Sequence, residues 1–326
     1  MNAFEYASPT TVKEAVALLG DSWADAAVLA GGTDLISLMK DYVMSPKRVV
    51  NIKGIKELTS MTPQNGGLRI GAAVTIEELI NYVNLRTAYP AIHAAAMEVA
   101  SPQIRNMGTV GGDICQRPRC WYFRQGHGLL AMHDGKSLVE NGENKYHAIF
   151  QGGPGRFVSA SSLGPAFVAL GAKVRIAGPK GNREVDAAQF FVDPKSADQR
   201  EIALAPNEIV TDVFVPSARK ILNSTYEVRQ REGLDWPIVT ASVALTMDGG
   251  KISAANVVLG HVATTPYMAV EAGKSLAGKA MEVDVAERAA ELAVAGAKPL
   301  SQNAYKVHLA KVAVKRALLA AGNIKA

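Results

Sequence analysis

The sequence predicts an α+β fold, in which strands and helices are grouped in different parts of the chain instead of alternating regularly. The strongest observation is a β-hairpin in the last third: two apolar segments, 239–247 and 252–262, flank the turn Asp248-Gly249-Gly250. Segments with helical patterns follow it, at 267–276, 285–293 and 303–319. The length of 326 residues suggests about two domains of roughly 150 residues each. We therefore expect the hairpin and its helices to form a C-terminal domain at 217–326.

The segment 1–56 is expected to form a small βαβ-like subdomain. Thr11 and Glu14 match a capping box, which predicts a helix over 12–19. The segment 27–30 predicts a short buried strand that leads into two glycines. A short helix at 35–40 and a strand at 49–52 complete this unit.

A second subdomain is expected at 57–216. It contains another capping box, Thr75 with Glu78, ahead of a helix. A polar, Gly-rich stretch at about 114–157 has no sustained periodicity, so we expect it to be an insertion. The other predicted elements are strands at 68–71 and 173–176 and a helix at 90–99.

Composition excludes several classes of protein. The net charge of +5 comes from 35 basic residues scattered among 30 acidic ones, without the long basic run that is typical of nucleic-acid binding. We find no run of about 18 apolar residues, so no membrane span is expected. Two cysteines make no disulfide framework and fit a reducing compartment. The N-terminus has no secretory signal pattern, so the cytoplasm is the default location.

A first glycine segment, Val28-Leu29-Ala30-Gly31-Gly32-Thr33-Asp34-Leu35, ends the predicted strand. Paired glycines let backbone N–H groups approach a ligand closely, and a helix start favours phosphate. Thr33 or Asp34 can cap that helix. The pattern is neither the GxGxxG fingerprint nor a Walker loop. Taken alone, it favours a tight strand-to-helix turn over a ligand site.

A second glycine segment, Ile104-Arg105-Asn106-Met107-Gly108-Thr109-Val110-Gly111-Gly112-Asp113, follows in the second subdomain. It again combines paired glycines with hydroxyl, amide and carboxylate side chains. Successive amides in such turns bind anions. We therefore expect the two segments to hold the two phosphates of one pyrophosphate.

Together the two segments resemble those of the flavoprotein subunits of the xanthine dehydrogenase and aldehyde oxidoreductase family, the molybdenum hydroxylases. In that family an Ala-Gly-Gly-Thr-type loop and an Ile-Arg-Asn-x-Gly-Thr-x-Gly-Gly-Asn-type loop hold the FAD diphosphate. The resemblance extends over nearly the whole chain, and the segment 116–124 is similar to that of bacterial aldehyde oxidoreductases. The other matching segments are Phe4-Glu5-Tyr6, 163–172 and Leu234-Asp235-Trp236-Pro237.

The resemblance implies a two-part FAD-binding domain of the vanillyl-alcohol-oxidase type, followed by a C-terminal α+β domain of the CO dehydrogenase flavoprotein type. It also implies a small partner subunit with [2Fe–2S] clusters and a large partner subunit with molybdenum and a pterin, in a heterotrimer or a dimer of it. The chain would pass electrons through FAD while an aldehyde or heterocycle is oxidised on the large subunit. The acceptor stays open among oxygen, a quinone, NAD and a small protein.

The cofactor-binding residues that the resemblance implies are Val28, Leu29, Ala30, Gly31, Gly32, Thr33, Asp34, Leu35, Ile104, Gly108, Thr109, Gly111, Gly112, Asp113, Ser162, Leu163 and Val210. No catalytic acid, base or nucleophile is predicted. Four positions depart from the family pattern. Asp113 replaces an Asn, Ser162 stands where relatives often have Asp, Val228 where many have Lys, and Val99 where xanthine dehydrogenases have an aromatic residue.

The inserted region of the related aldehyde oxidoreductases has four cysteines that bind a [4Fe–4S] cluster. Cys120 matches one of these positions, but Gly155 stands where the last cysteine is expected. Because such a cluster normally takes four thiolates and the chain has two cysteines, we predict none on this chain. Cys115, Cys120, His127 and His133 could in principle form a zinc site, but their spacing is too short for a zinc finger.

Two other functions remain as alternatives. One is a self-sufficient flavin oxidase with its own substrate pocket, and the other is a nucleotide-binding protein without enzymatic activity. Export together with a partner that has a twin-arginine signal is an alternative to the cytoplasm.

Overall fold

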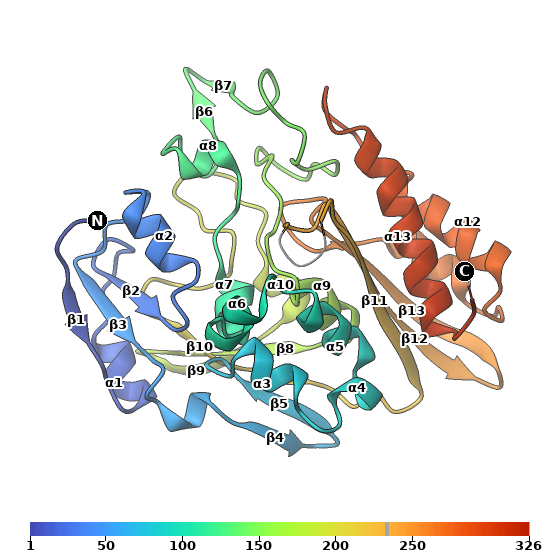
Figure 1. Cartoon of the computed structure of the whole chain (residues 1–326), viewed down its shortest axis with the longest axis horizontal. Coiled ribbons are helices and arrows are strands. Elements are labelled where there is room, and N and C mark those ends of the chain that lie inside the picture. The colour runs from blue at the N-terminus through green and yellow to red at the C-terminus, as the bar shows by residue number, and fades with distance from the viewer. Residues whose placement is uncertain (232–234, 326) are drawn as a thin grey trace.

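The computed structural model describes residues 1–231 and 235–325, so Leu234 of the predicted Leu-Asp-Trp-Pro motif lies outside the described residues. Three larger sheets follow one another along the chain, each covered by helices (Figure 1). No helix among the described residues is long and apolar enough to cross a membrane.

The N-terminal part is a three-stranded parallel sheet with strand order β1-β3-β2. The predicted capping box is present: Thr11 Oγ1 accepts a hydrogen bond from the Glu14 amide at 3.2 Å, and Glu14 accepts one from the Thr11 amide at 3.2 Å. Strand β1 is an addition to the predicted elements. The elements are β1 (Glu5–Ala7), α1 (Val12–Ala17), β2 (Ala26–Leu29), α2 (Leu35–Lys40) and β3 (Arg48–Asn51).

The second part is a five-stranded antiparallel sheet, β4-β5-β10-β8-β9, with helices packed on one face. The capping box of Thr75 and Glu78 starts α3, as predicted. The elements are η1 (Lys56–Leu58), β4 (Met61–Gln64), β5 (Gly67–Gly71), α3 (Ile76–Ile80), α4 (Leu85–Ala88), α5 (Pro90–Met97), α6 (Pro102–Met107), α7 (Val110–Cys115), α9 (Gly164–Ala169), β8 (Lys173–Gly178), β9 (Gly181–Asp186), α10 (Ala187–Phe190) and β10 (Ile209–Val215).

The inserted segment leaves the second part after α7 and returns before α9. It forms α8 (Trp121–Arg124) and a small hairpin, β6 (Met132–His133) with β7 (Lys136–Ser137), at the top of Figure 1. The returning stretch of chain pairs with the C-terminal domain, since the amides of Ile149 and Phe150 both donate to the Val262 carbonyl.

The C-terminal domain is a four-stranded antiparallel sheet, β11-β12-β13-β14, covered on one face by helices. The predicted hairpin is confirmed, with its turn at Asp248-Gly249-Gly250. The helix predicted from residue 267 begins later, because Tyr267 and Met268 form an edge strand against β13. The elements are β11 (Ile221–Val228), β12 (Val239–Asp248), β13 (Lys251–Gly260), β14 (Tyr267–Met268), α11 (Val270–Leu276), α12 (Val283–Val294) and α13 (Tyr305–Ala321).

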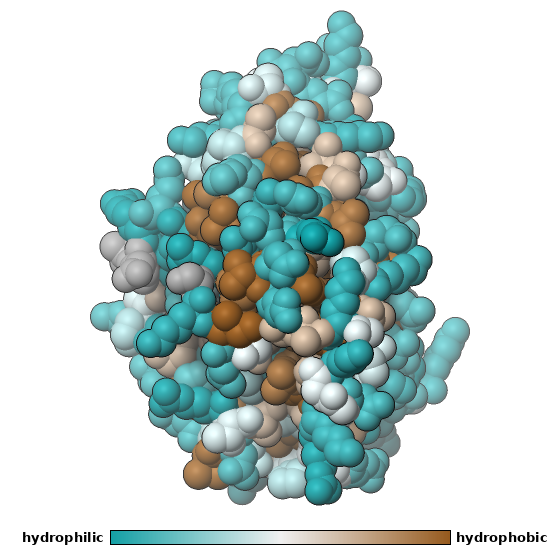
Figure 2. Space-filling view, turned by 90° about the vertical axis from the view of Figure 1, so that its right-hand side faces the viewer, coloured by the Kyte–Doolittle hydropathy of each residue, from teal (hydrophilic) through white to brown (hydrophobic). Residues whose placement is uncertain are grey.

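Figure 2 looks onto this helical face and shows apolar side chains gathered in its middle, with polar ones around and across them. Ion pairs link the two long helices there: Lys311 lies 2.8 Å from Glu291, and Lys315 lies 3.3 Å from Glu287. Such exposed pairs add little stability each. The alanine-rich inner face of α13 packs on the sheet instead, and that of α12 packs against α11 and α13.

Candidate functional site: a cradle of two glycine segments

The two glycine segments lie directly against each other, although they belong to different parts of the fold. A Cβ atom at Gly31 would overlap the carbonyl oxygen of Met107 and lie 3.0 Å from the Cα of Gly108. No side chain fits such an approach, so residue 31 must be glycine for the segments to meet. Sequence reasoning expected the glycines to face a ligand, and at Gly31 the structure shows a contact within the protein.

The first segment leaves a run of backbone amides unpaired. In the part of the chain that the structure describes, the amides of Gly31, Gly32, Thr33 and Asp34 have no intramolecular acceptor. Gly32 has a φ of +76°, a left-handed conformation that turns successive N–H groups toward one side. Free, convergent amides next to a strand end form an anion-binding concavity.

The second segment uses its amides differently. The Gly111 amide donates to the Ala72 carbonyl at 2.8 Å, the Gly112 amide to Thr109 Oγ1 at 3.1 Å, and the Asp113 amide to the Thr109 carbonyl at 2.8 Å. This differs from the expectation that both segments offer free amides. The reason is that α7 begins here, with Thr109 as its N-cap. A Cβ at Gly111 would meet Ala72 at 2.8 Å.

Two cavities meet at these segments and share Thr33, Asp34, Thr109 and Gly112 in their walls. The first is mainly apolar and lies between the N-terminal and second parts, where Trp23 and Val210 line it. The second opens toward the C-terminal domain, where Val99, Ser162 and Trp236 line it. An elongated ligand with a central anionic group would span both.

The predicted site residues can be compared with the residues that line these two cavities. All but two of them line one or both cavities. The exceptions, Leu29 and Leu163, line neither cavity, and their contact with a cofactor stays a prediction. Leu163 is fully buried and contributes its backbone amide instead. The residues that line the cavities are Val28, Ala30, Gly31, Gly32, Thr33, Asp34, Leu35, Ile104, Gly108, Thr109, Gly111, Gly112, Asp113, Ser162 and Val210.

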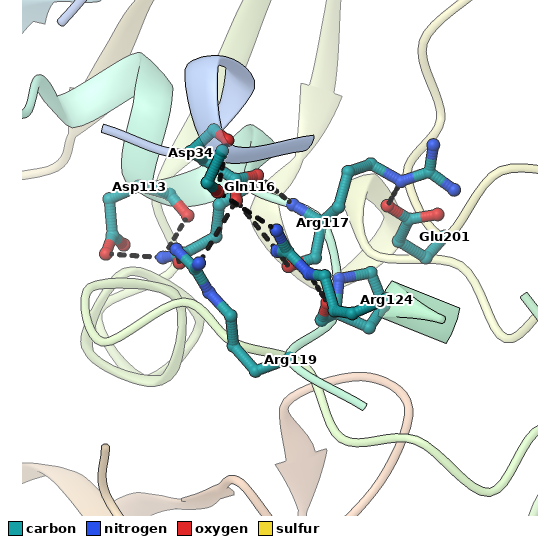
Figure 3. Close-up of polar contacts among 9 residues, drawn as sticks. Asp34, Asp113, Gln116, Arg117, Arg119, Arg124 and Glu201 are labelled. Atoms are coloured by element: carbon teal, nitrogen blue, oxygen red, sulfur yellow. Dashed lines mark hydrogen bonds and ion pairs between the residues drawn. The ribbon is translucent and has the colours of Figure 1, made fainter. Parts of the chain in front are cut away.

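Asp34 joins the cradle to the inserted segment (Figure 3). It occupies the N-cap position of α2 but makes no side-chain cap, contrary to expectation. Its carboxylate accepts hydrogen bonds from the Arg117 amide at 2.8 Å and from the Arg124 guanidinium at 2.7 Å, and it lies 3.2 Å from Arg119. The inserted segment thus supplies the donors to this carboxylate in place of the first amides of α2.

Arginines around the cradle pair with carboxylates. Arg117 pairs with Glu201 at 2.6 Å, and Arg200 lies 3.6 Å from Glu201 and over the Trp23 ring at 4.2 Å. Burial lowers the pKa of Arg117 and of Arg119 to about 10, which still leaves both charged at neutral pH. The cavity walls also contain the carboxylates of Glu98, Asp113, Glu208 and Asp235, so the side chains give no positive excess, and an anion would depend on the unpaired amides.

Sequence reasoning did not assign these arginines a role. The segment 116–124 served there only as a family likeness, although the three arginines within 117–124 were a visible signal. Arg119 and Arg124 pair with Asp34, which lies much earlier in the chain, in the first glycine segment. The pairing therefore depends on the fold.

Asp113 is surrounded by donors. It accepts hydrogen bonds from the Ser161 hydroxyl at 2.5 Å, the Leu163 amide at 3.0 Å, the Ser162 amide at 3.3 Å and Gln116 Nε2 at 3.0 Å. Burial raises the pKa of Asp113, and these bonds oppose that shift. An acceptor-only group suits this position better than the family's Asn, whose NH₂ would face donors. Asp113 thereby fixes the backbone of Ser162 beside the second cavity.

The cysteines do not form a metal site among the described residues. Cys120 Sγ lies 3.1 Å from His147 Nε2, whereas His127 and His133 are exposed. Cys120 packs in a buried apolar cluster with Phe157, and a Cβ at Gly155 would face the same ring at 3.2 Å. Burial raises the pKa of Cys115 to about 12, so that thiol stays protonated. The absence of a [4Fe–4S] cluster stays a prediction.

Comparison with known proteins identifies the class of this fold and site. Residues 2–218 match the family described as the FAD binding domain in molybdopterin dehydrogenase, and residues 224–321 match the CO dehydrogenase flavoprotein C-terminal domain. The chain belongs to this family of FAD-binding subunits of molybdenum hydroxylases. Both domain types that the resemblance implied are thus confirmed.

Particular relatives cover almost the whole chain. The carbon monoxide dehydrogenase medium chain of Afipia carboxidovorans is 31% identical over 97% of this chain and 96% of its own length. The aldehyde oxidoreductase FAD-binding subunit PaoB of Escherichia coli is 29% identical over 95% of this chain and 96% of its own. A chain in the crystal structure of quinoline 2-oxidoreductase from Pseudomonas putida 86 superimposes with a TM-score of 0.77 at 26% identity, covering 99% and 98% of the two chains.

Proposed function

We propose that this chain is the FAD-containing electron-transfer subunit of a molybdenum hydroxylase complex. It accepts electrons from the [2Fe–2S] clusters of a small subunit and passes them to an external acceptor. Oxidation of an aldehyde or a heterocycle takes place at molybdenum on a large subunit. The observation that supports this most is the run of unpaired amides at residues 31–34, placed where two cavities meet.

The residues fit FAD in a defined order along the site. The unpaired amides of the first segment would hold the diphosphate. The apolar cavity beside Trp23 and Val210 would take the adenosine, and the cavity beside Val99, Ser162 and Trp236 would take the isoalloxazine. FAD supplies the redox chemistry, because it takes up electrons singly and releases two.

The role of this chain is to bind, orient and shield that group. Asp113 fixes the segment 161–163 beside the second cavity, and Asp34 anchors the arginines of the inserted segment. Ile104 and Met107 of α6 are 37% and 47% exposed at the rim of this site, and Trp236 is 46% exposed. We assign the contact with the iron–sulfur subunit to this exposed side of the site.

Other features of the proposal concern organisation. We propose subdomain boundaries at 1–56 and 57–216, with the insertion at about 114–157, and a C-terminal domain at 217–326, because each of the three parts contains one larger sheet. We also propose cytoplasmic location by default, with export beside a signal-bearing partner as the alternative.

Reduction of the flavin tests the proposal. The purified chain should contain about one FAD and negligible iron. An aldehyde or purine added to it alone should leave the flavin oxidised, whereas adding the molybdenum and iron–sulfur subunits should bleach the flavin absorbance. Bleaching by substrate without partners would instead establish a self-sufficient flavin oxidase. A chain without bound flavin would favour the non-enzymatic alternative.

A further inference from the structure

The C-terminal domain places a buried carboxylate beside the cavity that we assign to the isoalloxazine. The side chain of Glu227, in β11, is 1% exposed and forms an ion pair with Arg229, whose side chain is 5% exposed. Arg229 also donates to the carbonyl of Glu98 at 2.5 Å and lies 3.0 Å from the Glu98 carboxylate. Because Glu98 lines that cavity, one arginine joins the buried carboxylate to the wall of the flavin site.

These three side chains carry two negative charges and one positive charge when Glu227 is ionised. Burial raises the pKa of Glu227 to about 7, although the positive charge of Arg229 opposes that shift. Its carboxyl group therefore exchanges a proton close to neutral pH. Electrons that enter the neighbouring site add negative charge there, and a nearby negative charge favours the protonated form of a carboxyl group. Reduction of the site and protonation of Glu227 are thus expected to favour each other.

A chain of polar side chains leads from Glu227 to a third cavity. Thr240 Oγ1 donates to Glu227 Oε2 at 3.5 Å and lies 3.1 Å from His261 Nδ1. Since the hydroxyl has a single proton, Nδ1 must be the donor to Thr240, which leaves Nε2 of His261 unprotonated. His261 lines a cavity of about 260 Å³ between the inserted segment and the C-terminal domain. Tyr146 and Trp236, which are 38% and 46% exposed, also line this cavity, so it reaches the surface.

His261 is suited to pass a proton without keeping it. Within the described residues its Nε2 atom has no hydrogen-bond partner. Its φ of +62° is uncommon for a residue with a Cβ atom, and Lys306 Nζ, from α13, stabilises that backbone by donating to the His261 carbonyl at 2.7 Å. Burial, together with the charges of Lys306 and Arg229, lowers the pKa of His261 to about 3. The imidazole is therefore neutral, and a neutral imidazole can accept at one nitrogen while it donates from the other.

We propose that Glu227 takes up a proton when the flavin is reduced, and that this proton enters from the third cavity through His261 and Thr240. The inference rests on the proposed function, in which the electrons come from the iron–sulfur clusters of the small subunit. A proton from solvent binds His261 Nε2, the Nδ1 proton moves to Thr240 Oγ1, and the hydroxyl proton moves to Glu227 Oε2. Glu227 becomes a neutral carboxylic acid, and His261 stays neutral with its proton on Nε2. Reoxidation returns one proton to solvent by the reverse path.

The midpoint potential of the bound flavin tests this in the purified, flavin-loaded chain. Followed by absorbance between about pH 6 and 9, its slope against pH counts the protons taken up with the electrons. Below about pH 7 Glu227 already has its proton before reduction, so the additional uptake belongs above pH 7. There the wild type should take up more protons than Glu227→Gln, by up to one. Glu271→Gln, the same change at a side chain that is 70% exposed, should match the wild type. Equal slopes for wild type and Glu227→Gln above pH 7 would overturn the proposal.

Infrared difference spectra of the reduced and oxidised wild type give a second measurement, which needs no variant. At about pH 8, reduction should produce a protonated carboxyl band that shifts in D₂O. A spectrum without this band would overturn the proposal even if Glu227→Gln failed to fold.

His261→Asn tests the route, since asparagine tolerates a positive φ better than other residues with a Cβ atom. The variant should keep the wild-type slope of the potential, because Glu227 is intact. After rapid reduction, however, it should take up the proton about tenfold or more slowly, as a pH-indicator dye would record. An unchanged rate would contradict the route through His261. A purified chain without flavin would refute the proposed function and this inference with it, whereas a flavin-loaded chain without the additional proton would refute this inference alone.

Discussion

The glycine cradle and the contact between the inserted segment and the C-terminal domain both bury polar groups, but they pair them in opposite ways. In the cradle, side chains pair with one another while the amides of residues 31–34 stay free. At the contact, side chains pair with distant backbone. Lys306 Nζ donates to the carbonyls of Tyr146, His147 and His261 at 3.2, 3.0 and 2.7 Å, and Asn303 donates to those of His147 and Ala148. The cradle is arranged for a ligand, and the contact for stability.

The largest effect is expected from Gly31→Ala, because the new Cβ would overlap a backbone oxygen that cannot move as a side chain can. The two segments would separate, and the variant should purify almost without flavin. The visible flavin spectrum per protein measures this directly. Gly54→Ala is the matched control, since nothing lies within 4 Å of its added Cβ. Full flavin content in the Gly31 variant would disprove the close contact.

Lys306→Met should break the contact while sparing the cradle. Three buried carbonyls would lose their donor, which costs about 3 kcal/mol of the free energy of unfolding at about 1 kcal/mol each. Lys311→Met makes the same change on an exposed side of α13, where a surface ion pair is worth at most about 1 kcal/mol. Urea unfolding compares the two variants. Flavin bound per folded molecule should stay unchanged in both; similar destabilisation by both would show that the three carbonyl bonds contribute little.

Gly111→Ala separates two explanations of the second glycine segment. If that glycine permits phosphate approach, the variant should lose flavin without losing stability. The structure predicts the reverse, because the added Cβ would lie 2.8 Å from the Ala72 side chain, inside the core. We expect a loss of about 1–3 kcal/mol in stability from overpacking, with flavin retained by the folded fraction. Thermal unfolding and flavin content, measured on one preparation, decide between them.

The same contrast explains what the sequence could predict. The capping boxes at Thr11 and Thr75 and the hairpin turn at Asp248 depend on neighbours close in sequence, so local pattern sufficed. Each glycine segment was also visible as a local pattern, but only the family resemblance indicated that the two lie together. Strands β9, β10 and β11 were missed, since their pairing is decided by the sheet rather than by their own periodicity. The roles of Arg119, His261 and Lys306 depend on partners in other parts of the chain, which no short motif records.

The most gradual expected effect concerns the pH dependence of the contact. Burial lowers the pKa of His261 to about 3 and that of His147 to about 4, from 6.5 in the unfolded chain. Below pH 6.5 the unfolded state thus binds two protons that the folded state does not, and stability falls as the pH falls. Each such proton contributes about 1.4 kcal/mol per pH unit.

His261→Asn removes one of them, so between about pH 6 and 4.5 its free energy of unfolding should fall less steeply than that of the wild type, by about 1.4 kcal/mol per pH unit. Urea unfolding at several pH values measures both slopes, and Val83→Phe, at a position that is 83% exposed, should keep the wild-type slope. Equal slopes of the free energy of unfolding against pH for wild type and His261→Asn would mean that His261 gains its proton in the folded state. The burial at the contact would then not lower the pKa of His261.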